Sequence, residues 1–189
     1  MKKEEEDRSF DPVADRLIKS RKLVICEEIN QAMAKRVIGQ LLAMADESNE
    51  DIHLFINSQG GHVEAGDSIH DMIQYVDARV KVIGTGYVAS AGTHIFLAAD
   101  KEDRYCLPNT RFLIHQPSGG VGGQASDIAI QAEQIIRMRE RLAQIIANAT
   151  GQPIERVRTD IERDRWLTTG EAIDYGIVSQ VVRSSKEIS

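Results

Sequence analysis

Short runs of β-branched and apolar residues alternate with amphipathic helical segments along most of this chain. Lys22–Cys26, Ile52–Ile56 and Val80–Ile83 are predicted strands, and the segments between them, about Gln31–Ala45 and Val63–Val76, are predicted helices. Each helix repeats apolar residues along one side and must bury that side, which a neighbouring sheet allows. The alternation therefore predicts an α/β fold.

The pattern continues through the middle of the chain. A turn of small residues, Gly84–Gly92, follows the third strand and leads into an apolar helix. A fourth strand, Arg111–Ile114, ends at His115. A glycine-rich segment then precedes the longest predicted helix, about Ser126–Ala147, for which Ser126 is the expected N-cap. Gly151 is expected to end that helix in a left-handed conformation.

The last part of the chain carries clear helix boundaries. Pro153 opens a short helix, and Thr168 with Glu171 forms a capping box for another. That helix is expected to stop at Gly176, before a closing strand over Ile177–Val182.

Length and composition predict one domain. The chain has 189 residues, of which 42% are apolar, enough for a sizeable core. Residues 1–14 are charged and lack periodicity, so we expect a mobile N-terminal arm there, and residues 184–189 are expected to form a short C-terminal tail. The predicted domain covers residues 15–183.

Charge and hydropathy exclude several functions. The net charge of −6 disfavours binding to nucleic acid. Residues 1–10 contain no apolar run that resembles a signal peptide, and no stretch approaches the length of a membrane span, which predicts a cytoplasmic protein without membrane contact. Cys26 and Cys106 each lie in an apolar stretch and are expected to be buried free thiols.

Ser90 is the first candidate for chemistry. A serine hydroxyl needs a base to remove its proton and backbone donors where the oxyanion forms. At a helix start among small residues, Ser90 would be exposed, and the amide of Ala91 would be one oxyanion donor. The pair Gly60–Gly61 follows the second strand and could supply another. Each signal alone is weak, because small residues more often serve turns and helix packing.

The residues alone leave the base and the carboxylate open. The candidates for the base are His53, His62, His70, His94 and His115. His94 lies one helical turn after Ser90, without an obvious carboxylate near it in the sequence, whereas His115 ends a strand, where site residues are often carried. Asp164 lies in a charged run that is typical of a solvated helix end.

Together these segments resemble the ClpP family from about residue 16 to 182. The resemblance rests on Ile-Asn-Ser-Gln-Gly-Gly (56–61), Tyr-Val-Ala-Ser-Ala-Gly (87–92), Arg-Tyr-Cys-Leu-Pro-Asn (104–109), Ile-His-Gln-Pro (114–117), Gly-Gln-Ala-Ser-Asp-Ile (123–128) and Glu-Arg-Asp-Arg-Trp (162–166).

The resemblance implies a serine peptidase. Ser90 takes the position of the nucleophile, His115 that of the general base, and Asp164 that of the residue orienting the histidine. The amides of Gly61 and Ala91 take the positions of the oxyanion hole. Arg163 matches a position that links assembly to the alignment of its neighbouring aspartate. No cofactor and no metal is implied.

The resemblance also implies an architecture. The fold would be the ClpP/crotonase-like arrangement of repeated β-β-α units, with a strand-helix handle over about residues 116–147. Two heptameric rings would stack through the handles and enclose the serines. The glycine-rich strand 118–123 would contribute to ring contact and bind extended polypeptide substrates. Because the chain lacks a P-loop motif, a separate hexameric AAA+ unfoldase such as ClpX, ClpA or ClpC is the implied partner.

Three residues depart from the family pattern. Gln59 replaces the usual proline, Ala91 the usual methionine, and His94 stands at a usually apolar position. Such departures are expected of a second ClpP paralogue, which can form a homo-oligomer or a mixed barrel. One alternative is a ring subunit that stays silent until a partner ring aligns its triad. Another is a crotonase-type acyl-CoA enzyme, which normally uses a pocket carboxylate as base.

Overall fold

The computed structural model describes residues 11–120 and 122–188, and it has the predicted α/β fold. The α-helices are α1 (Pro12–Lys19), α2 (Gln31–Glu47), α3 (Val63–Tyr75), α4 (Ala91–Phe96), α5 (Ala125–Thr150), α6 (Ile154–Asp160) and α7 (Thr169–Tyr175). The strands are β1 (Lys22–Ile25), β2 (Ile52–Ser58), β3 (Val80–Ala89), β4 (Arg104–Cys106), β5 (Arg111–Ile114), β6 (Arg165–Thr168) and β7 (Gln180–Val181). Two short 3₁₀ turns, η1 (Lys101–Asp103) and η2 (Ser185–Glu187), complete the elements.

The strands form one mixed sheet in which β3 is the central element. The order β1-β2-β3-β4-β7 is parallel throughout. The second half of β3 leaves β4 and pairs instead with β5, also in parallel. β5 then pairs with β6 in the antiparallel direction. Parallel neighbours joined through helices are what the alternating sequence predicts.

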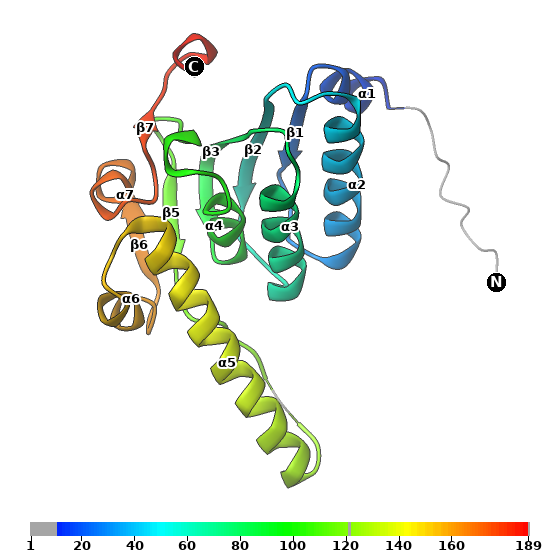
Figure 1. The fold of residues 1–189 in the computed structure, drawn as a ribbon. Helices are drawn as coiled ribbons and strands as arrows, with labels where there is room; N and C mark the ends of the chain where they lie inside the picture. Colours follow the sequence, from blue (N-terminus) through cyan, green and yellow to red (C-terminus); the bar gives the residue numbers. More distant parts are fainter. Residues whose placement is uncertain (1–10, 121, 189) are drawn as a thin grey trace, which may run out of the picture.

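The core lies between this sheet and the row of helices α2, α3 and α4 (Figure 1). α2 buries Met33, Val37 and Leu41, which recur about one helical turn apart, and α3 buries Ile69 and Ile73. Along β2, fully buried residues alternate with partly buried ones, the period of two expected of a strand. The two periodicities read from the sequence therefore meet in one apolar layer.

Helix α5 extends away from the body as the predicted handle (Figure 1). Only its C-terminal turns are anchored, since its buried residues begin at Ala143. The helix ends at Gly151 in the left-handed conformation, as predicted, with φ 76°. The expected N-cap was wrong: the cap is Gln124, without a side-chain hydrogen bond, and the helix already includes Ser126.

Three strand predictions needed correction. The stretch Gly84–Ala89 is strand rather than turn, because it gains pairing partners in β4 and β5 that lie far along the chain. Conversely, no strand occurs in the described part of segment 118–123, that is, 118–120 and 122–123; residue 121 lies outside the described residues. A strand needs a hydrogen-bonded neighbour, and the strands among the described residues offer none to positions 118–120 and 122–123. The closing strand is also shorter than predicted, only Gln180–Val181.

The ends of the chain and one cysteine also differ from expectation. Within the predicted arm, residues 1–10 lie outside the described residues, but Asp11 caps α1 and the helix begins at Pro12. The predicted tail contains the turn η2. The domain boundaries 15–183 stay a prediction. Cys106 is buried, and burial raises the pKa of its thiol to about 12, whereas Cys26 is exposed because it follows the end of β1.

Gly176 provides a test of the way the handle is anchored. It ends α7, as predicted, with φ 92°, and a Cβ there would lie 2.4 Å from the carbonyl oxygen of Thr150 at the end of α5. Gly176→Ala should therefore destabilise the fold by about 2 kcal/mol or more. Gly39→Ala is the matched control, because Gly39 is helical and a Cβ there would meet nothing within 4 Å. The control should stabilise by about 0.5–1 kcal/mol. Thermal unfolding measures both, and a similar midpoint for the two variants would contradict the prediction.

Candidate active site

Ser90 sits at a sharp turn between β3 and α4. Its backbone is left-handed, with φ 55° and ψ −122°, a conformation that costs a non-glycine residue about 1–3 kcal/mol. The amide of Ser90 donates to the carbonyl of Leu113 on β5, at 3.1 Å. The Thr93 hydroxyl lies 2.8 Å from the carbonyl oxygens of both Val88 and Leu113. These contacts hold the strained turn and direct the Ser90 side chain away from the sheet.

His115 follows the last residue of β5, directly beside this turn. Its Nε2 lies 2.8 Å from Oγ of Ser90. On its other side, Nδ1 lies 3.0 Å from Oδ1 of Asp164. The second contact follows from the sheet register, because Ile114 of β5 is paired with Arg165 of β6. In an antiparallel pair the next residues on each strand, His115 and Asp164, also face each other.

The loop that carries Asp164 is tied to the segment after His115. The amide of Gln116 donates to the carbonyl of Ile161 at 2.6 Å, and its side-chain amide donates to the carbonyl of Glu162 at 2.8 Å. Asp164 itself is exposed over 65% of its side chain, against 22% for His115. The imidazole of His115 is therefore mostly buried, whereas the carboxylate of Asp164 is mostly exposed to solvent in the single chain.

Two further sequence-predicted residues lie next to Ser90. Ala91 is the first residue of α4, where its amide has no preceding turn of helix to bind. Gly60 packs on the Ser90 turn so closely that a Cβ there would lie 2.6 Å from Cβ of Ser90. Gly61 has φ 150°, and a Cβ there would lie 2.2 Å from the carbonyl oxygen of Ile29. Only glycine fits at either position.

A small, mostly apolar pocket adjoins the Ser90 and His115 side chains. Its other lining residues are Val63, Ala91, His94, Pro117 and Leu142. His94, the rival base in the sequence, is only 3% exposed, and the imidazole next to the Ser90 hydroxyl is that of His115. His94 does have a carboxylate neighbour, Asp67, which the sequence did not reveal because it comes from a different helix.

The likeness to known proteins agrees with this geometry. The sequence profile described as Clp protease matches residues 3–185. The chain belongs to the Clp protease family. The resemblance read from the sequence motifs is thereby confirmed, and with it the serine-type peptidase class. The crotonase alternative is not supported.

Curated relatives in the Clp protease family match nearly the whole chain. The chain is 57% identical over 172 residues to ATP-dependent Clp protease proteolytic subunit 3 of Rhizobium etli, covering 91% of this chain and 89% of the relative. It is 51% identical over 172 residues to proteolytic subunit 2 of Pseudomonas aeruginosa, covering 91% and 86%. Several relatives are thus named as second or third subunits, which suits the expected paralogue.

A solved Clp structure confirms the fold. ClpP1 from Listeria monocytogenes is 51% identical and superposes with a TM-score of 0.85, over 94% of this chain and 99% of that chain. A mutant of the same protein superposes with a TM-score of 0.88. The fold class read from the sequence is therefore that of the Clp proteolytic subunits.

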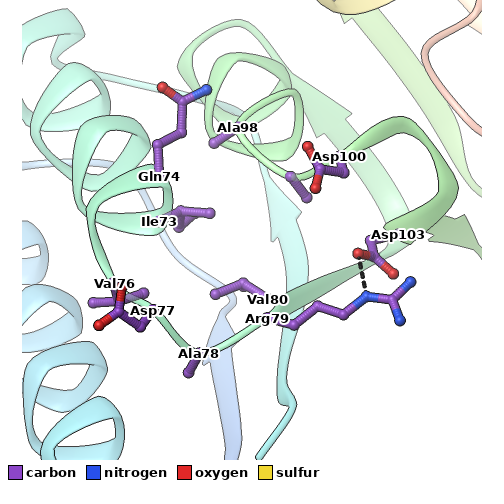
Figure 2. A pocket seen from close by; sticks show the side chains of 11 residues that line it. Ile73, Gln74, Val76, Asp77, Ala78, Arg79, Val80, Ala98, Asp100 and Asp103 are labelled. Atoms are coloured by element: carbon purple, nitrogen blue, oxygen red, sulfur yellow. Dashed lines mark hydrogen bonds and ion pairs between the residues drawn. The ribbon is translucent and has the colours of Figure 1, made fainter. Parts of the chain in front are cut away.

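A larger cavity in the molecule lacks the groups that peptide hydrolysis needs. This cavity of about 470 Å³ lies where α3 ends and β3 begins, and Figure 2 shows Gln74, Asp100 and Asp103 around it. There Nε of Arg79 lies 2.7 Å from Oδ2 of Asp103. The lining contains acids and one guanidinium but no hydroxyl nucleophile, thiol or histidine. Size alone therefore does not identify the active site of this Clp subunit.

Within residues 11–120 and 122–188, no three His, Cys, Asp or Glu side chains gather in a way that could hold a metal ion. Over the same part of the chain, no helix is both long and apolar enough to cross a membrane.

Sequence reasoning missed the residues that support the site. Thr93 and Leu113 hold the turn of Ser90, and Gln116 holds the loop of Asp164. None of them belongs to a residue type that stands out in a sequence. Only the left-handed turn has a recognisable signal, because a run of small residues around a serine is compatible with a strained strand-to-helix turn.

Proposed function

We propose that this chain is a serine endopeptidase subunit in which Ser90 is the nucleophile, His115 the general base and Asp164 the residue that orients the imidazole. One observation carries the proposal: a continuous chain of contacts, 2.8 Å from Ser90 Oγ to Nε2 and 3.0 Å from Nδ1 to Asp164 Oδ1. A histidine between a hydroxyl and a carboxylate is the arrangement that activates serine for acyl transfer.

The reaction follows from these contacts. Nδ1–H of His115 donates to Asp164, which leaves the lone pair of Nε2 directed at the Ser90 hydroxyl. When Oγ attacks the peptide carbonyl, Nε2 takes its proton, and the imidazolium then gives that proton to the leaving amine. A water molecule repeats the sequence on the acyl ester and releases the acid. Asp164 stays ionised and stabilises the imidazolium.

The amides of Gly61 and Ala91 form the proposed oxyanion hole. The parallel bridge between Ile29 and Gly61 uses the carbonyl of Gly60 and the amide of His62, so it leaves the amide of Gly61 for a ligand. The amide of Ala91 begins α4, where the helix dipole also favours a negative oxygen. Two backbone donors can thus meet one carbonyl oxygen that becomes negative in the transition state.

Assembly into two stacked heptameric rings is the second part of the proposal. The relatives are named as proteolytic subunits of an ATP-dependent protease, a name that implies a larger complex. The protruding helix α5 exposes Ile130 over 60% and Ile136 over 66% of their surface, apolar area that a second copy could cover. A homo-oligomer and a mixed barrel with a paralogue both satisfy this requirement.

The proposed substrates are unfolded polypeptides and short peptides. The glycine-rich segment 118–123 has no strand partner in the described residues and could pair with extended substrate through its backbone. Because the chain has no P-loop, a hexameric AAA+ unfoldase would supply the work of unfolding, and the cytoplasm would be the shared compartment.

Replacing the nucleophile tests the proposal most directly. Ser90→Ala should lower peptide hydrolysis by roughly 10³-fold or more and abolish labelling by a fluorophosphonate probe, since no other hydroxyl of residues 11–120 and 122–188 hydrogen-bonds to the imidazole of His115. Ser68→Ala is the matched control, because that hydroxyl is exposed on α3 and bonds only its own helix. Native mass spectrometry should show the same assembly for both variants. Hydrolysis by Ser90→Ala at the parental rate would refute the triad.

Arg163 tests the proposed link between assembly and catalysis. It follows α6 in the exposed loop of Asp164 and makes no hydrogen bond or ion pair with any residue in 11–120 or 122–188, so its guanidinium is available to a second copy. Arg163→Ala should lower activity by about tenfold or more while shifting the complex toward smaller assemblies in native mass spectrometry. Arg183→Ala, which also removes an exposed guanidinium, should change neither. An intact complex of Arg163→Ala with parental activity would count against the link.

A further inference from the structure

A polar cluster joins three helices behind the candidate nucleophile. Asp67 and His70 lie on α3, His94 on α4, and Arg141 on α5. Oδ1 of Asp67 is 2.8 Å from Nε2 of His94, and Oδ2 forms an ion pair with the guanidinium of Arg141. The imidazoles of His70 and His94 stack, with centroids 4.5 Å apart and planes within 6°. One carboxylate thus connects α3 to both other helices.

The cluster is also connected directly to the turn of Ser90. The amide of His94 donates to the carbonyl of Ser90 at 3.1 Å, so one helical turn separates the two residues. His94 also lines the small pocket beside the Ser90 and His115 side chains, together with Leu142, the neighbour of Arg141. A movement of α4 that displaced His94 would therefore displace the Ser90 turn.

The two imidazoles of the cluster are buried, whereas the side chain of Arg141 is 52% exposed. His70 and His94 are 5% and 3% exposed, and the Asp67 side chain is 22% exposed. Burial alone would raise the pKa of the Asp67 carboxyl, but His94 and Arg141 outweigh it and hold that pKa below its ordinary value. For His70, burial and the neighbouring His94 together lower the pKa. These contacts therefore favour the charged carboxylate form of Asp67, whereas His70 favours its neutral form.

The imidazole of His94 depends on Asp67 for its orientation. Its ring N–H does not point straight at the carboxylate, and within residues 11–120 and 122–188 neither ring nitrogen has an aligned hydrogen bond. Asp71 is the other carboxylate of α3 in this region, and it lies against Nδ1 of His70 at 3.4 Å. Asp67 is the only group with an ion-pair contact to His94 among these residues. Without Asp67, a buried imidazole and the guanidinium of Arg141 would lose their shared partner.

We propose that Asp67 is a positioning residue for Ser90, because it holds His94 of the nucleophile helix and Arg141 of the handle at the same time. The inference rests on the proposed role of Ser90. The bridge fixes the angle of α4 against α5, and with it the direction of the Ser90 hydroxyl toward Nε2 of His115. Loss of the bridge would slow the chemical step more than substrate binding, because misplacement by a fraction of an ångström acts on the reacting atoms.

The test uses the purified full-length chain and a fluorogenic peptide, with active serines counted by the end point of fluorophosphonate labelling. The rate of peptide hydrolysis is divided by the number of labelled serines. This ratio falls when each site is slower, but it does not fall when fewer molecules are folded or assembled. The variants are Asp67→Asn, which keeps the shape of the side chain, Arg141→Met and the double variant. Arg158→Met is the matched control, because Arg158 pairs with Glu140 on α5 and with Glu155 on its own helix.

Each single variant should lower kcat per labelled site about tenfold, with KM changed by less than about twofold. The double variant should have about the same kcat per labelled site as the less active of the two single variants, since both changes remove the same bridge. Arg141→Lys, which keeps the charge, should recover most of the rate, and Arg158→Met should match the parent. If the chain alone turns over no peptide, the rate constant of fluorophosphonate labelling replaces kcat.

Parental per-site rates in both single variants would overturn the inference, and so would losses that multiply in the double variant. If Asp67→Asn does not fold, Arg141→Met and Arg141→Lys decide the question alone. The two proposals fail separately. Hydrolysis by Ser90→Ala would overturn the triad itself, whereas an inactive Ser90→Ala beside an unaffected Asp67→Asn would overturn only the role of Asp67.

Discussion

The position of β5 is the constraint on which the candidate site depends. The carbonyl of Leu113 on this strand accepts the amide of Ser90 and lies 2.8 Å from the hydroxyl of Thr93, so it fixes the strained turn. One strand end also carries His115, and the register with β6 sets Asp164 opposite it. Pairing on both sides of a single four-residue strand thus brings together groups from three parts of the sequence. A shift of one residue in that register would turn alternate side chains to the other face and separate them.

Arginine side chains, one of them buried, attach the handle to the body. Arg104 is 4% exposed and donates to the carbonyls of Ala99, Ala149 and Gly176, where α5 and α7 end near the chain that follows α4. Burial lowers the pKa of its guanidinium to about 10, yet the group stays charged at neutral pH and satisfies carbonyls that the helix ends leave free. Arg141 adds a second charged attachment through Asp67. With the ion pair between Arg158 of α6 and Glu140, the base of α5 is held by three guanidinium groups, and Arg141 is the one beside the turn of Ser90.

The same arrangement explains which parts of the chain depend on other copies. The glycines before α5 have open surroundings, since a Cβ at Gly119, Gly120 or Gly122 would meet nothing within 4 Å. The carboxylate of Asp164 is largely exposed, although it contacts His115. A single chain therefore supplies the contact geometry of the proposed triad but little of the enclosure that would exclude water from it. Enclosure of the site is the property that assembly would add.

Much of this protein was determined by its sequence alone, because the relevant forces are local. Apolar periodicity set the helices of the core, the Thr168–Glu171 capping box set the start of α7, and Gly151 and Gly176 set helix ends that require a left-handed residue. The density of motifs was enough to name the family. Tertiary structure decided what depends on contacts between distant segments. Gly84–Ala89 became strand by pairing with β2, β4 and β5, and His94 acquired Asp67 only through the packing of two helices. His115 rather than His94 faces Ser90 because strand register, which no local pattern encodes, places its ring 2.8 Å from the hydroxyl.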